Sequence, residues 1–292
     1  MMIPDGKTRW AAVVASPIEH SLSPLIHNTA FQSLGINATY LAFDVSEEEL
    51  EDAFSGLKAF KGLGFNLSMP NKQEALKYVD CVSEEARLIG AVNTVVNSEG
   101  SLTGYNTDGI GFIKSLESEQ VFVTDKKVTV LGSGGAGLSI IVALALSDVK
   151  KITVFKRPND NFEAVSDNLQ FIAQQTRCEI ELLAFGCDTR LTDTIATSDI
   201  LVNTTNVGMG EGSTDTLVKE TSCLIPSLVV VDIIYNPKET QLLEDAKSKG
   251  CQTINGLGML IYQAAEAFKL WTGQDMPVED VKKAILEHER NL

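Results

Sequence analysis

The chain has 292 residues, of which 44% are hydrophobic and 22% charged. These values are typical of a folded protein with about two domains, and they exclude disordered and fibrous classes. The formal net charge of -15 argues against nucleic acid or an acidic membrane as partner, because both attract clustered Lys and Arg.

Cysteine and histidine usage suggests no metal site and no disulfide framework. The five cysteines form no C-x-x-C pair, and the three histidines lack the spacing of metal ligands. No stretch approaches the roughly 20 apolar residues of a membrane helix, and the first residues lack the apolar core of a signal peptide. We therefore expect a cytoplasmic protein with reduced thiols.

The first hundred residues alternate short apolar runs with amphipathic stretches, which is typical of βα units. Residues 10–15 predict a strand, and residues 25–34 predict a helix that ends at Gly35. Ser23 is expected as the N-cap of that helix, with Pro24 at its first position. Further elements are expected as strands 39–43 and 63–68, an acidic helix opened by a Ser46–Glu49 capping box, a helix opened by Pro70, and a hairpin of 91–96 and 101–105.

A second alternation begins near residue 126 and has the pattern of a dinucleotide-binding fold. Its elements are expected as strand 127–131, a glycine-rich turn, a helix to 146, and strands 151–155, 200–203 and 228–232. The sheet should end near residue 254. Helices 257–271 and 278–289 should then return to the first domain.

The predicted fold class is therefore α/β with two domains. Residues 1–108 and 258–292 should form an N-terminal, mainly parallel α/β domain that binds the substrate. Residues 109–257 should form a Rossmann-type dinucleotide-binding domain.

The glycine-rich turn matches G-x-G-x-x-G. Gly132, Gly134, Gly135 and Ala136 follow a strand and open a helix, which is the context that makes this motif meaningful. The missing side chains let backbone amides approach a pyrophosphate, and the helix N-terminus adds partial positive charge. A plain glycine turn is the less favoured reading.

The end of the next strand carries conflicting signals for the cofactor. An acidic residue at this place suits the ribose of NAD, and an arginine suits the 2′-phosphate of NADP. Lys156 and Arg157 are basic, whereas Asp160 follows closely and would repel a phosphate. Either basic residue alone could also be a solvated strand end.

Three polar clusters in the first domain fall at strand ends or helix starts, where open α/β sheets bind ligands. They are His20-Ser21-Leu-Ser23-Pro24, Asn66-Leu-Ser68-Met-Pro70-Asn71-Lys72, and Asn93-Thr94 with Asn106-Thr107-Asp108. Taken singly, each residue has a structural explanation, such as a helix cap or a surface side chain. Their joint occurrence favours a functional explanation instead.

In this order the clusters resemble the shikimate dehydrogenase family across nearly the whole chain. The shared segments are Pro17–Pro24, Pro70-Asn-Lys72, Gly90-Ala-Val-Asn-Thr94, Gly104-Tyr-Asn-Thr-Asp-Gly109, Asn203-Thr-Thr205 with Gly208-Met209, Tyr235-Asn-Pro237, and Asn255-Gly256 through Met259 to Gln263. The resemblance implies oxidation of the ring hydroxyl of shikimate, of quinate, or of both, in the shikimate pathway or in quinate use.

The resemblance also implies residue roles. Lys72 and Asp108 match the catalytic pair, and which of them is the formal base stays open. The expected contacts of the substrate carboxylate are Ser21, Ser23 and Tyr235, and those of the ring hydroxyls are Ser68, Asn93 and Gln263. The expected cofactor contacts are Gly132, Gly134, Gly135, Ala136, Lys156, Arg157, Asp160, Thr204, Gly258 and Met259. His20 is a rival base that we assign to shaping its loop.

The run Ser68 to Gln73 is similar to the quinate/shikimate branch, which accepts NAD as well as NADP. Strictly NADP-dependent members commonly read Asn-Arg-Thr-x-x-Arg where this chain reads Lys156 to Asn161, so the second arginine is missing. On this basis the sequence favours NAD and leaves NADP open.

Three alternative readings compete with this one. The protein could accept only one of the two acids, it could be a catalytically silent sensor of such ligands, or it could be an amino-acid or folate dehydrogenase with the same nucleotide domain. The last does not explain Ser21 and Ser23. The expected partners are small molecules rather than nucleic acid or membrane, and monomer and homodimer both stay open.

Overall fold

The computed structural model describes residues 3–210 and 212–290. The chain forms two compact units, one of Met1–Gly111 with Ile261–Leu292 and one of Phe112–Leu260. Both boundaries fall three residues later than the predicted 109–257 segment, because helices α4 (Asp108–Ser118) and α9 (Leu257–Thr272) each run from one unit into the other.

The first unit is built on a six-stranded sheet of order β2-β1-β3-β5-β6-β4. The β1/β2, β1/β3 and β4/β6 pairs are parallel, whereas β5 is antiparallel to both of its neighbours. The sheet is therefore mixed, with three parallel pairs. Its strands are β1 (Arg9–Ala15), β2 (Ala38–Asp44), β3 (Gly64–Leu67), β4 (Cys81–Val82), β5 (Thr94–Ser98) and β6 (Ser101–Tyr105).

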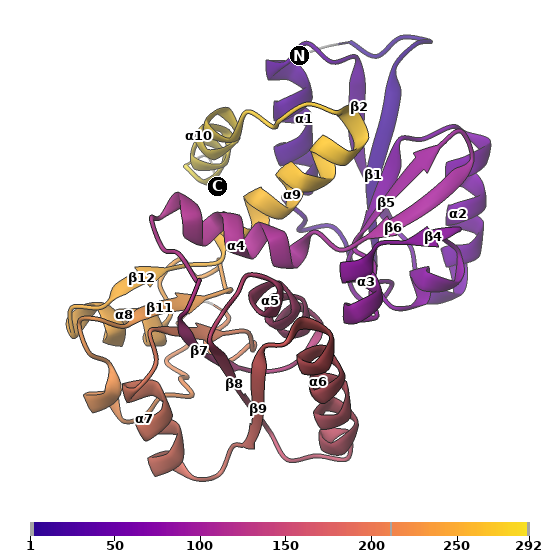
Figure 1. Ribbon diagram of the computed structural model, residues 1–292. Helices are drawn as coiled ribbons and strands as arrows, with labels where there is room; N and C mark the ends of the chain where they lie inside the picture. Colours follow the sequence, from indigo (N-terminus) through magenta and orange to yellow (C-terminus); the bar gives the residue numbers. More distant parts are fainter. Residues whose placement is uncertain (1–2, 211, 291–292) are drawn as a thin grey trace. The chain divides into compact units, whose positions relative to one another are not determined.

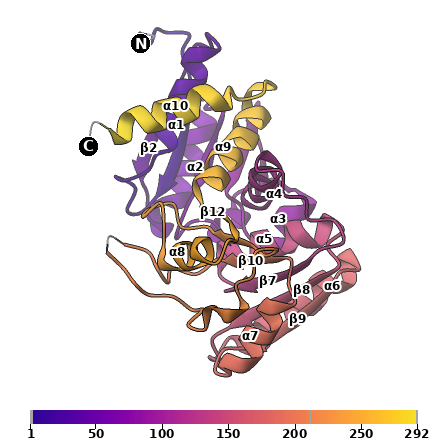
Figure 2. The ribbon, with the colours of Figure 1, turned by 90° about the vertical axis from the view of Figure 1, so that its left-hand side faces the viewer.

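Helices cover both faces of this sheet (Figure 1). On one face, α2 buries Leu50, Phe54 and Leu57 against Ala12 and Val14 of β1. On the other face, α1 lies beside α10 (Figure 2). The ring of His27 on α1 also stacks with that of Phe268 on α9, with centroids 6.3 Å apart. The helical segments are α1 (Ser23–Ser33), η1 (Glu47–Glu49), α2 (Leu50–Ala59), η2 (Glu74–Lys77), α3 (Glu84–Ile89) and α10 (Val278–Glu289).

Close packing fastens α9 to the sheet. The Trp271 indole N–H donates to the Val95 carbonyl at 2.9 Å. A Cβ on Gly64 would lie 1.9 Å from the same carbonyl and 2.4 Å from the indole nitrogen. Only glycine fits there, and this packing joins the C-terminal part of α9 to the first unit.

Two local predictions in this unit are wrong. Ser23 is the first residue of α1 and Leu22 is its N-cap, whereas Gly35 with a φ of 64° ends the helix as expected. Pro70 opens no helix. Residues 69–73 form turns, and only Glu74–Lys77 is helical, as a 3₁₀ segment. The Ser46–Glu49 capping box is present.

The second unit has a six-stranded parallel sheet of order β12-β11-β10-β7-β8-β9. Numbered along this unit, the order is 3-2-1-4-5-6 when read from β9, which is the Rossmann arrangement. Its strands are β7 (Lys127–Leu131), β8 (Lys151–Lys156), β9 (Glu179–Ala184), β10 (Ile200–Asn203), β11 (Val229–Asp232) and β12 (Gln252–Ile254). The predicted two-domain α/β fold is confirmed.

Helices again cover both faces, with α5 and α6 on one and α7 and α8 on the other (Figure 1). Leu191, Leu242 and Leu243 of α7 and α8 pack on Leu131 and Leu201 of the sheet. The helical segments are α5 (Gly135–Leu146), α6 (Phe162–Thr176), α7 (Asp188–Ala196), η3 (Thr221–Cys223) and α8 (Gln241–Ser248). Among the described residues, no helix has the length and apolarity that crossing a membrane requires.

Candidate active site

The predicted polar clusters of the first unit gather at one edge of its sheet. Strands β1, β3 and β6 end at this edge, and the antiparallel strand β5 begins there. Backbone hydrogen bonds join the segments that follow β1 and β3, from Ser16 N–H to the Met69 carbonyl at 3.4 Å and from Ser68 N–H to the Val14 carbonyl at 3.3 Å. The edge thus has the location that ligand sites of open α/β sheets share.

Lys72 and Asp108 form an ion pair at this edge. The Lys72 Nζ donates to Asp108 Oδ2 at 2.6 Å, and the two side chains are 24% and 11% exposed. Both groups are thus largely withdrawn from water yet still reachable. A cation and an anion in such contact can hold and pass a proton on a bound hydroxyl.

The loop of Lys72 is fixed by its neighbours. The Lys72 carbonyl accepts from Val92 N–H at 2.8 Å. The preceding Asn71 is fully buried, and its amide donates to the Val45 carbonyl at 2.8 Å. Val92 and Val45 are distant from this loop in the sequence. They fix the backbone of Lys72 directly and the preceding residue, Asn71, through its side chain.

Asp108 is positioned by the start of α4. Its backbone N–H donates to Asn106 Oδ1 at 3.1 Å, and its Oδ1 accepts from the Asn93 amide at 2.7 Å. An acidic residue in the first turn of a helix is favoured by the helix dipole. Each carboxylate oxygen therefore has a separate donor, Asn93 on one side and Lys72 on the other.

The two serines expected to bind a carboxylate lie at the start of α1. Ser23 is buried and its N–H donates to Ser21 Oγ at 3.3 Å, while Ser21 is half-buried. The first turn of α1 contains no acidic residue, so its partial positive charge is available to an anion. Ser68 is exposed at the end of β3.

Gln263 and Tyr235 belong to different units. Gln263 lies on the part of α9 that joins the first unit, where a Cβ on Gly111 of α4 would meet its backbone nitrogen at 2.5 Å. Tyr235 follows β11 in the second unit, with 37% of its surface exposed. The structure thus brings Lys72 and Asn93 each into contact with Asp108, whereas Tyr235 belongs to the second unit.

The sequence assigned no role to the buried groups behind this edge, although Asn66 and Thr94 belong to its polar clusters. Asn66 and Thr94 are register partners on β3 and β5 and are hydrogen-bonded to each other at 3.0 Å. His27 stacks on Tyr40 with ring centroids 4.3 Å apart. Burial lowers the pKa of His27 to about 3 and raises that of Tyr40. The polar residues in otherwise apolar strands were the only available signal.

The glycine loop of the second unit fits a pyrophosphate. Gly132 has a φ of 106°, and a Cβ there would lie 2.8 Å from Thr204 Oγ1. Gly134 and Gly135, which cap and open α5, face open space. The glycine loop follows β7, and Thr204 follows β10. These two strands are adjacent in the sheet, and the strand order reverses between them. The backbone amides of the loop and the N-terminus of α5 therefore lie at this topological switch point, where such sheets bind dinucleotides.

Thr204 supports this loop from inside the fold. It is buried, and its hydroxyl donates to the Leu131 carbonyl at 2.9 Å. A Cβ on Gly137 would lie 2.6 Å from the same hydroxyl oxygen. The Thr204 side chain therefore shapes the glycine turn.

At the end of β8, the two basic residues differ in environment. Lys156 is buried and its Nζ donates to Asn159 Oδ1 at 2.6 Å. Arg157 and Asp160 are exposed. Arg157 is consequently the more available cation, and Asp160 is the available anion.

The start of α9 is closely packed in the second unit. A Cβ on Gly258 would lie 2.3 Å from Ser115 Oγ, and Met259 is 9% exposed. Nearby, the buried Asp232 accepts from Asn203, Thr240 and Ile234 N–H. Burial raises the pKa of Asp232, which the sequence analysis did not single out.

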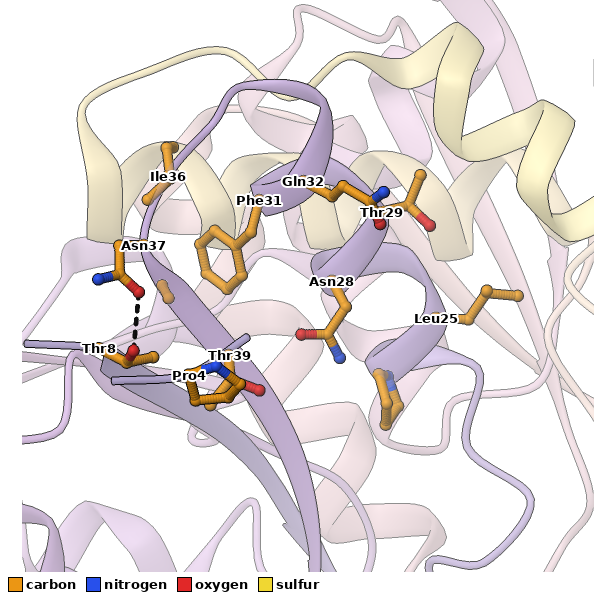
Figure 3. Close-up of a pocket in the computed structure, with 12 residues that line it drawn as sticks. Pro4, Thr8, Leu25, Asn28, Thr29, Phe31, Gln32, Ile36, Asn37 and Thr39 are labelled. Atoms are coloured by element: carbon orange, nitrogen blue, oxygen red, sulfur yellow. Dashed lines mark hydrogen bonds between the residues drawn. The ribbon is translucent and has the colours of Figure 1, made fainter. Parts of the chain in front are cut away.

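A further hollow of about 490 Å³ lies between α1 and β2 (Figure 3). Its lining is apolar or uncharged, with Asn28, Gln32 and Asn37 as the amides. None of the residues predicted to bind substrate or cofactor lines it. It lacks the cation or ion pair that an acid substrate or a phosphate would need.

Comparisons with known proteins agree over nearly the whole chain. The family model of the shikimate dehydrogenase substrate binding domain matches residues 13–95, and that of the shikimate 5′-dehydrogenase C-terminal domain matches residues 256–286. The shikimate dehydrogenase (NADP(+)) of Streptococcus pneumoniae (strain Hungary19A-6) is 47% identical over 283 residues, which are 97% of this chain and 98% of the relative.

Two solved structures are similar along their full length. Shikimate 5-dehydrogenase from Listeria monocytogenes in complex with shikimate and NAD is 42% identical, with a TM-score of 0.94 and coverage of 98% of this chain and 99% of that one. Quinate dehydrogenase from Corynebacterium glutamicum in complex with NAD is 29% identical, with a TM-score of 0.86 and coverage of 96% and 99%.

Proposed function

Because the chain belongs to the shikimate dehydrogenase family, we propose that it oxidises a ring hydroxyl of shikimate reversibly with a nicotinamide dinucleotide. The observation that carries this proposal is the 2.6 Å contact between Lys72 and Asp108 at the sheet edge. The same edge supplies Asn93, Ser68 and the start of α1. The test is turnover itself, followed by the absorbance of the reduced dinucleotide.

Oxidation of a secondary alcohol requires that its hydroxyl proton leaves together with the hydride. The bound dinucleotide supplies the hydride acceptor. Lys72 is proposed to contact the reacting hydroxyl and to stabilise the negative charge that develops on oxygen. Its ammonium passes one proton to the adjacent Asp108 carboxylate as it takes up the proton of the hydroxyl. Asp108 holds the Lys72 ammonium in place and balances its charge.

The remaining polar groups suit the other parts of a polyhydroxy acid. Asn93, Ser68 and Gln263 are proposed to bind ring hydroxyls, which would otherwise lose their water without compensation. Ser21 and Ser23, with the start of α1, are proposed to bind the carboxylate, and Tyr235 is the proposed contribution of the second unit.

The carboxylate assignment predicts a specific binding defect. The Ser21→Ala, Ser23→Ala double variant should lower kcat/KM for shikimate by about 100-fold, mainly through KM, because hydrogen bonds to a charged group contribute roughly 1.5–3 kcal/mol each. Steady-state kinetics measure this. The matched control is Ser33→Ala, an exposed serine at the other end of α1. Equal binding of shikimate and its methyl ester by the parent would contradict the assignment.

The two nicotinamide dinucleotides, NAD and NADP, remain to be distinguished. In the sequence, Asp160 and the absence of a second arginine from the segment Lys156 to Asn161 favoured NAD, whereas the name of the pneumococcal relative favours NADP. The Listeria relative was solved with NAD. We propose that NADP is preferred and that Arg157 binds its 2′-phosphate, since Arg157 is exposed while the Lys156 ammonium is engaged with Asn159.

Arg157→Ala should therefore lower kcat/KM for NADP about tenfold or more and change that for NAD little, because only NADP carries the 2′-phosphate. Asp160→Ser should raise NADP use by removing a like charge. The control is Arg190→Ala, an exposed arginine on α7. A parent that prefers NAD, or an Arg157→Ala variant with equal losses for both cofactors, would contradict this choice.

Quinate is a second candidate substrate, favoured by the likeness to the Corynebacterium glutamicum quinate dehydrogenase. Relative turnover of the two acids decides between one substrate and both. A sensor role has no support among the comparisons. The cytoplasmic location stays a prediction, and monomer and homodimer both stay open.

A further inference from the structure

A row of polar side chains crosses one face of the first unit's sheet toward the ion pair. Asn66 of β3 pairs with Thr94 of β5, and Thr94 pairs with Tyr105 of β6. Register partners point to the same face of a sheet. Tyr40 of β2 reaches this row past Ala11, its partner on β1, and its hydroxyl donates to Asn66 Oδ1 at 2.6 Å.

The row continues without interruption to the carboxylate of Asp108. Asn66 Nδ2 donates to Thr94 Oγ1 at 3.0 Å, and Thr94 Oγ1 donates to Asn93 Oδ1 at 2.9 Å. Asn93 Nδ2 then donates to Asp108 Oδ1 at 2.7 Å. Asn66, Thr94 and Asn93 are at most 6% exposed, so water does not compete for these bonds.

Backbone groups fix the direction of these hydrogen bonds at both ends. Asn66 Nδ2 also faces the Asn93 carbonyl at 3.3 Å, which can only accept. Asn93 Oδ1 also receives the Thr107 N–H at 2.8 Å, which can only donate. The Thr94 hydroxyl lies between them, where it accepts from Asn66 Nδ2 and donates to Asn93 Oδ1. The Thr107 hydroxyl is a further neighbour, 3.1 Å from Thr94 Oγ1, and it also donates to Asn93 Oδ1 at 3.2 Å. A valine side chain can neither accept nor donate these bonds.

We propose that Thr94, with Asn66 behind it, is a positioning residue that holds the Asn93 amide against Asp108 and so keeps the second carboxylate oxygen on Lys72. This inference rests on the proposed roles of Lys72 and Asp108. Among the described contacts, the Thr94 side chain touches neither Lys72 nor Asp108. It acts on them through Asn93.

Geometry gives this arrangement a catalytic consequence. If the Asn93 amide rotates, Asp108 loses the donor on Oδ1 and its carboxylate can turn away from the lysine. A displacement of about 1 Å at reacting groups can lower a rate about 100-fold. A fully satisfied buried network also resists such motion better than its separate bonds would.

The test compares kcat in Thr94→Val, which keeps the shape and loses the hydroxyl, with kcat in Thr94→Ser, which keeps the hydroxyl. Thr94→Val should lower kcat about tenfold or more and leave the KM of the dinucleotide within about twofold, whereas Thr94→Ser should stay within about threefold of the parent. Thr94→Ala replaces Thr94→Val if the latter does not fold. Thr129→Val is the matched control, because Thr129 is a fully buried threonine of β7 whose hydroxyl pairs with Ser198.

A double-mutant cycle separates positioning from mere structural support. In an Asn93→Ala background, Thr94→Val should change kcat by less than about twofold, because its route to Asp108 is already lost. Equal losses in both backgrounds, or an unchanged kcat in Thr94→Val itself, would overturn the inference. If Lys72→Ala kept normal kcat, the proposed function would fail instead, and the two failures are distinguishable.

Discussion

Replacing Lys72 by alanine is expected to lower kcat for shikimate oxidation by at least about 10³-fold, because proton transfer and charge stabilisation each contribute roughly 10²-fold or more. Lys72 is the cation in contact with Asp108, at 2.6 Å, and its ammonium is only partly exposed. Removing it takes away both effects together. The KM for shikimate should change much less, since most proposed substrate contacts lie on other residues. Steady-state kinetics with saturating dinucleotide measure both parameters.

The matched control is Lys77→Ala. Lys77 lies on the neighbouring 3₁₀ segment, is 67% exposed, and pairs with Glu74 at the surface. Its loss should leave kcat within about twofold, because exposed ion pairs contribute little. Near-normal kcat in Lys72→Ala would remove this residue from the chemical step.

Acid is expected to destabilise the first unit through His27. This ring is fully buried between Tyr40, Phe268 and Trp271, and within the described residues neither nitrogen has a hydrogen-bond partner. Burial lowers its pKa from 6.5 to about 3. Between these values the unfolded chain binds a proton at His27 and the folded protein does not.

The free energy of unfolding therefore falls as the pH is lowered through this window. The expected slope from His27 is about 1.4 kcal/mol per pH unit, which sums to about 5 kcal/mol across the window. A loss of that size is comparable with the whole stability of many domains. The stabilisation is fully present above the ordinary pKa of 6.5 and is lost on acidification.

Urea unfolding followed by tryptophan fluorescence measures this effect, because both tryptophans, Trp10 and Trp271, belong to the first unit. Between pH 7 and pH 4.5, a His27→Leu variant should lose on average about 1 kcal/mol less per pH unit than the parent, and the difference should approach the full slope only well below pH 6.5. His27→Phe is a second variant, and His288→Leu on the surface of α10 is the control, whose curve should follow the parent. Parallel curves for parent and His27→Leu would contradict the account.

The four strands of the second unit whose bounds the sequence predicted, 127–131, 151–155, 200–203 and 228–232, agree with β7, β8, β10 and β11 to within one residue. The sequence predicted no bounds for β9, α6, α7 and α8. The inner strands β7, β8, β10 and β11 are buried along most of their length, so they contain apolar runs such as Ile200–Val202 and Val229–Val231. The glycine loop was also predicted correctly, because its strand, turn and helix follow one another along the chain. The predicted elements agree with the structure where the contacts that determine them lie close together in the sequence.

Predictions were wrong or missing where distant contacts decide. Pro70 suggested a helix start, but the buried Asn71 ties this loop to Val45. The pairing of Asn66 with Thr94 depends on the antiparallel register of β5, which periodicity does not specify. The same is true of Gly64, where a Cβ would clash with the Val95 carbonyl of the neighbouring strand and with the indole of Trp271, more than two hundred residues further along. The roles of Lys72 and Asp108 came from resemblance, and the structure adds their contact.

The most direct test of the central claim is the rate at which the purified protein reduces a dinucleotide with shikimate or quinate, each against NADP and NAD. The account predicts formation of reduced dinucleotide with shikimate, faster with NADP than with NAD, and loss of that activity in Lys72→Ala but not in Lys77→Ala. Absence of reduction with all four pairs, by a protein whose tryptophan fluorescence shows it to be folded, would contradict it.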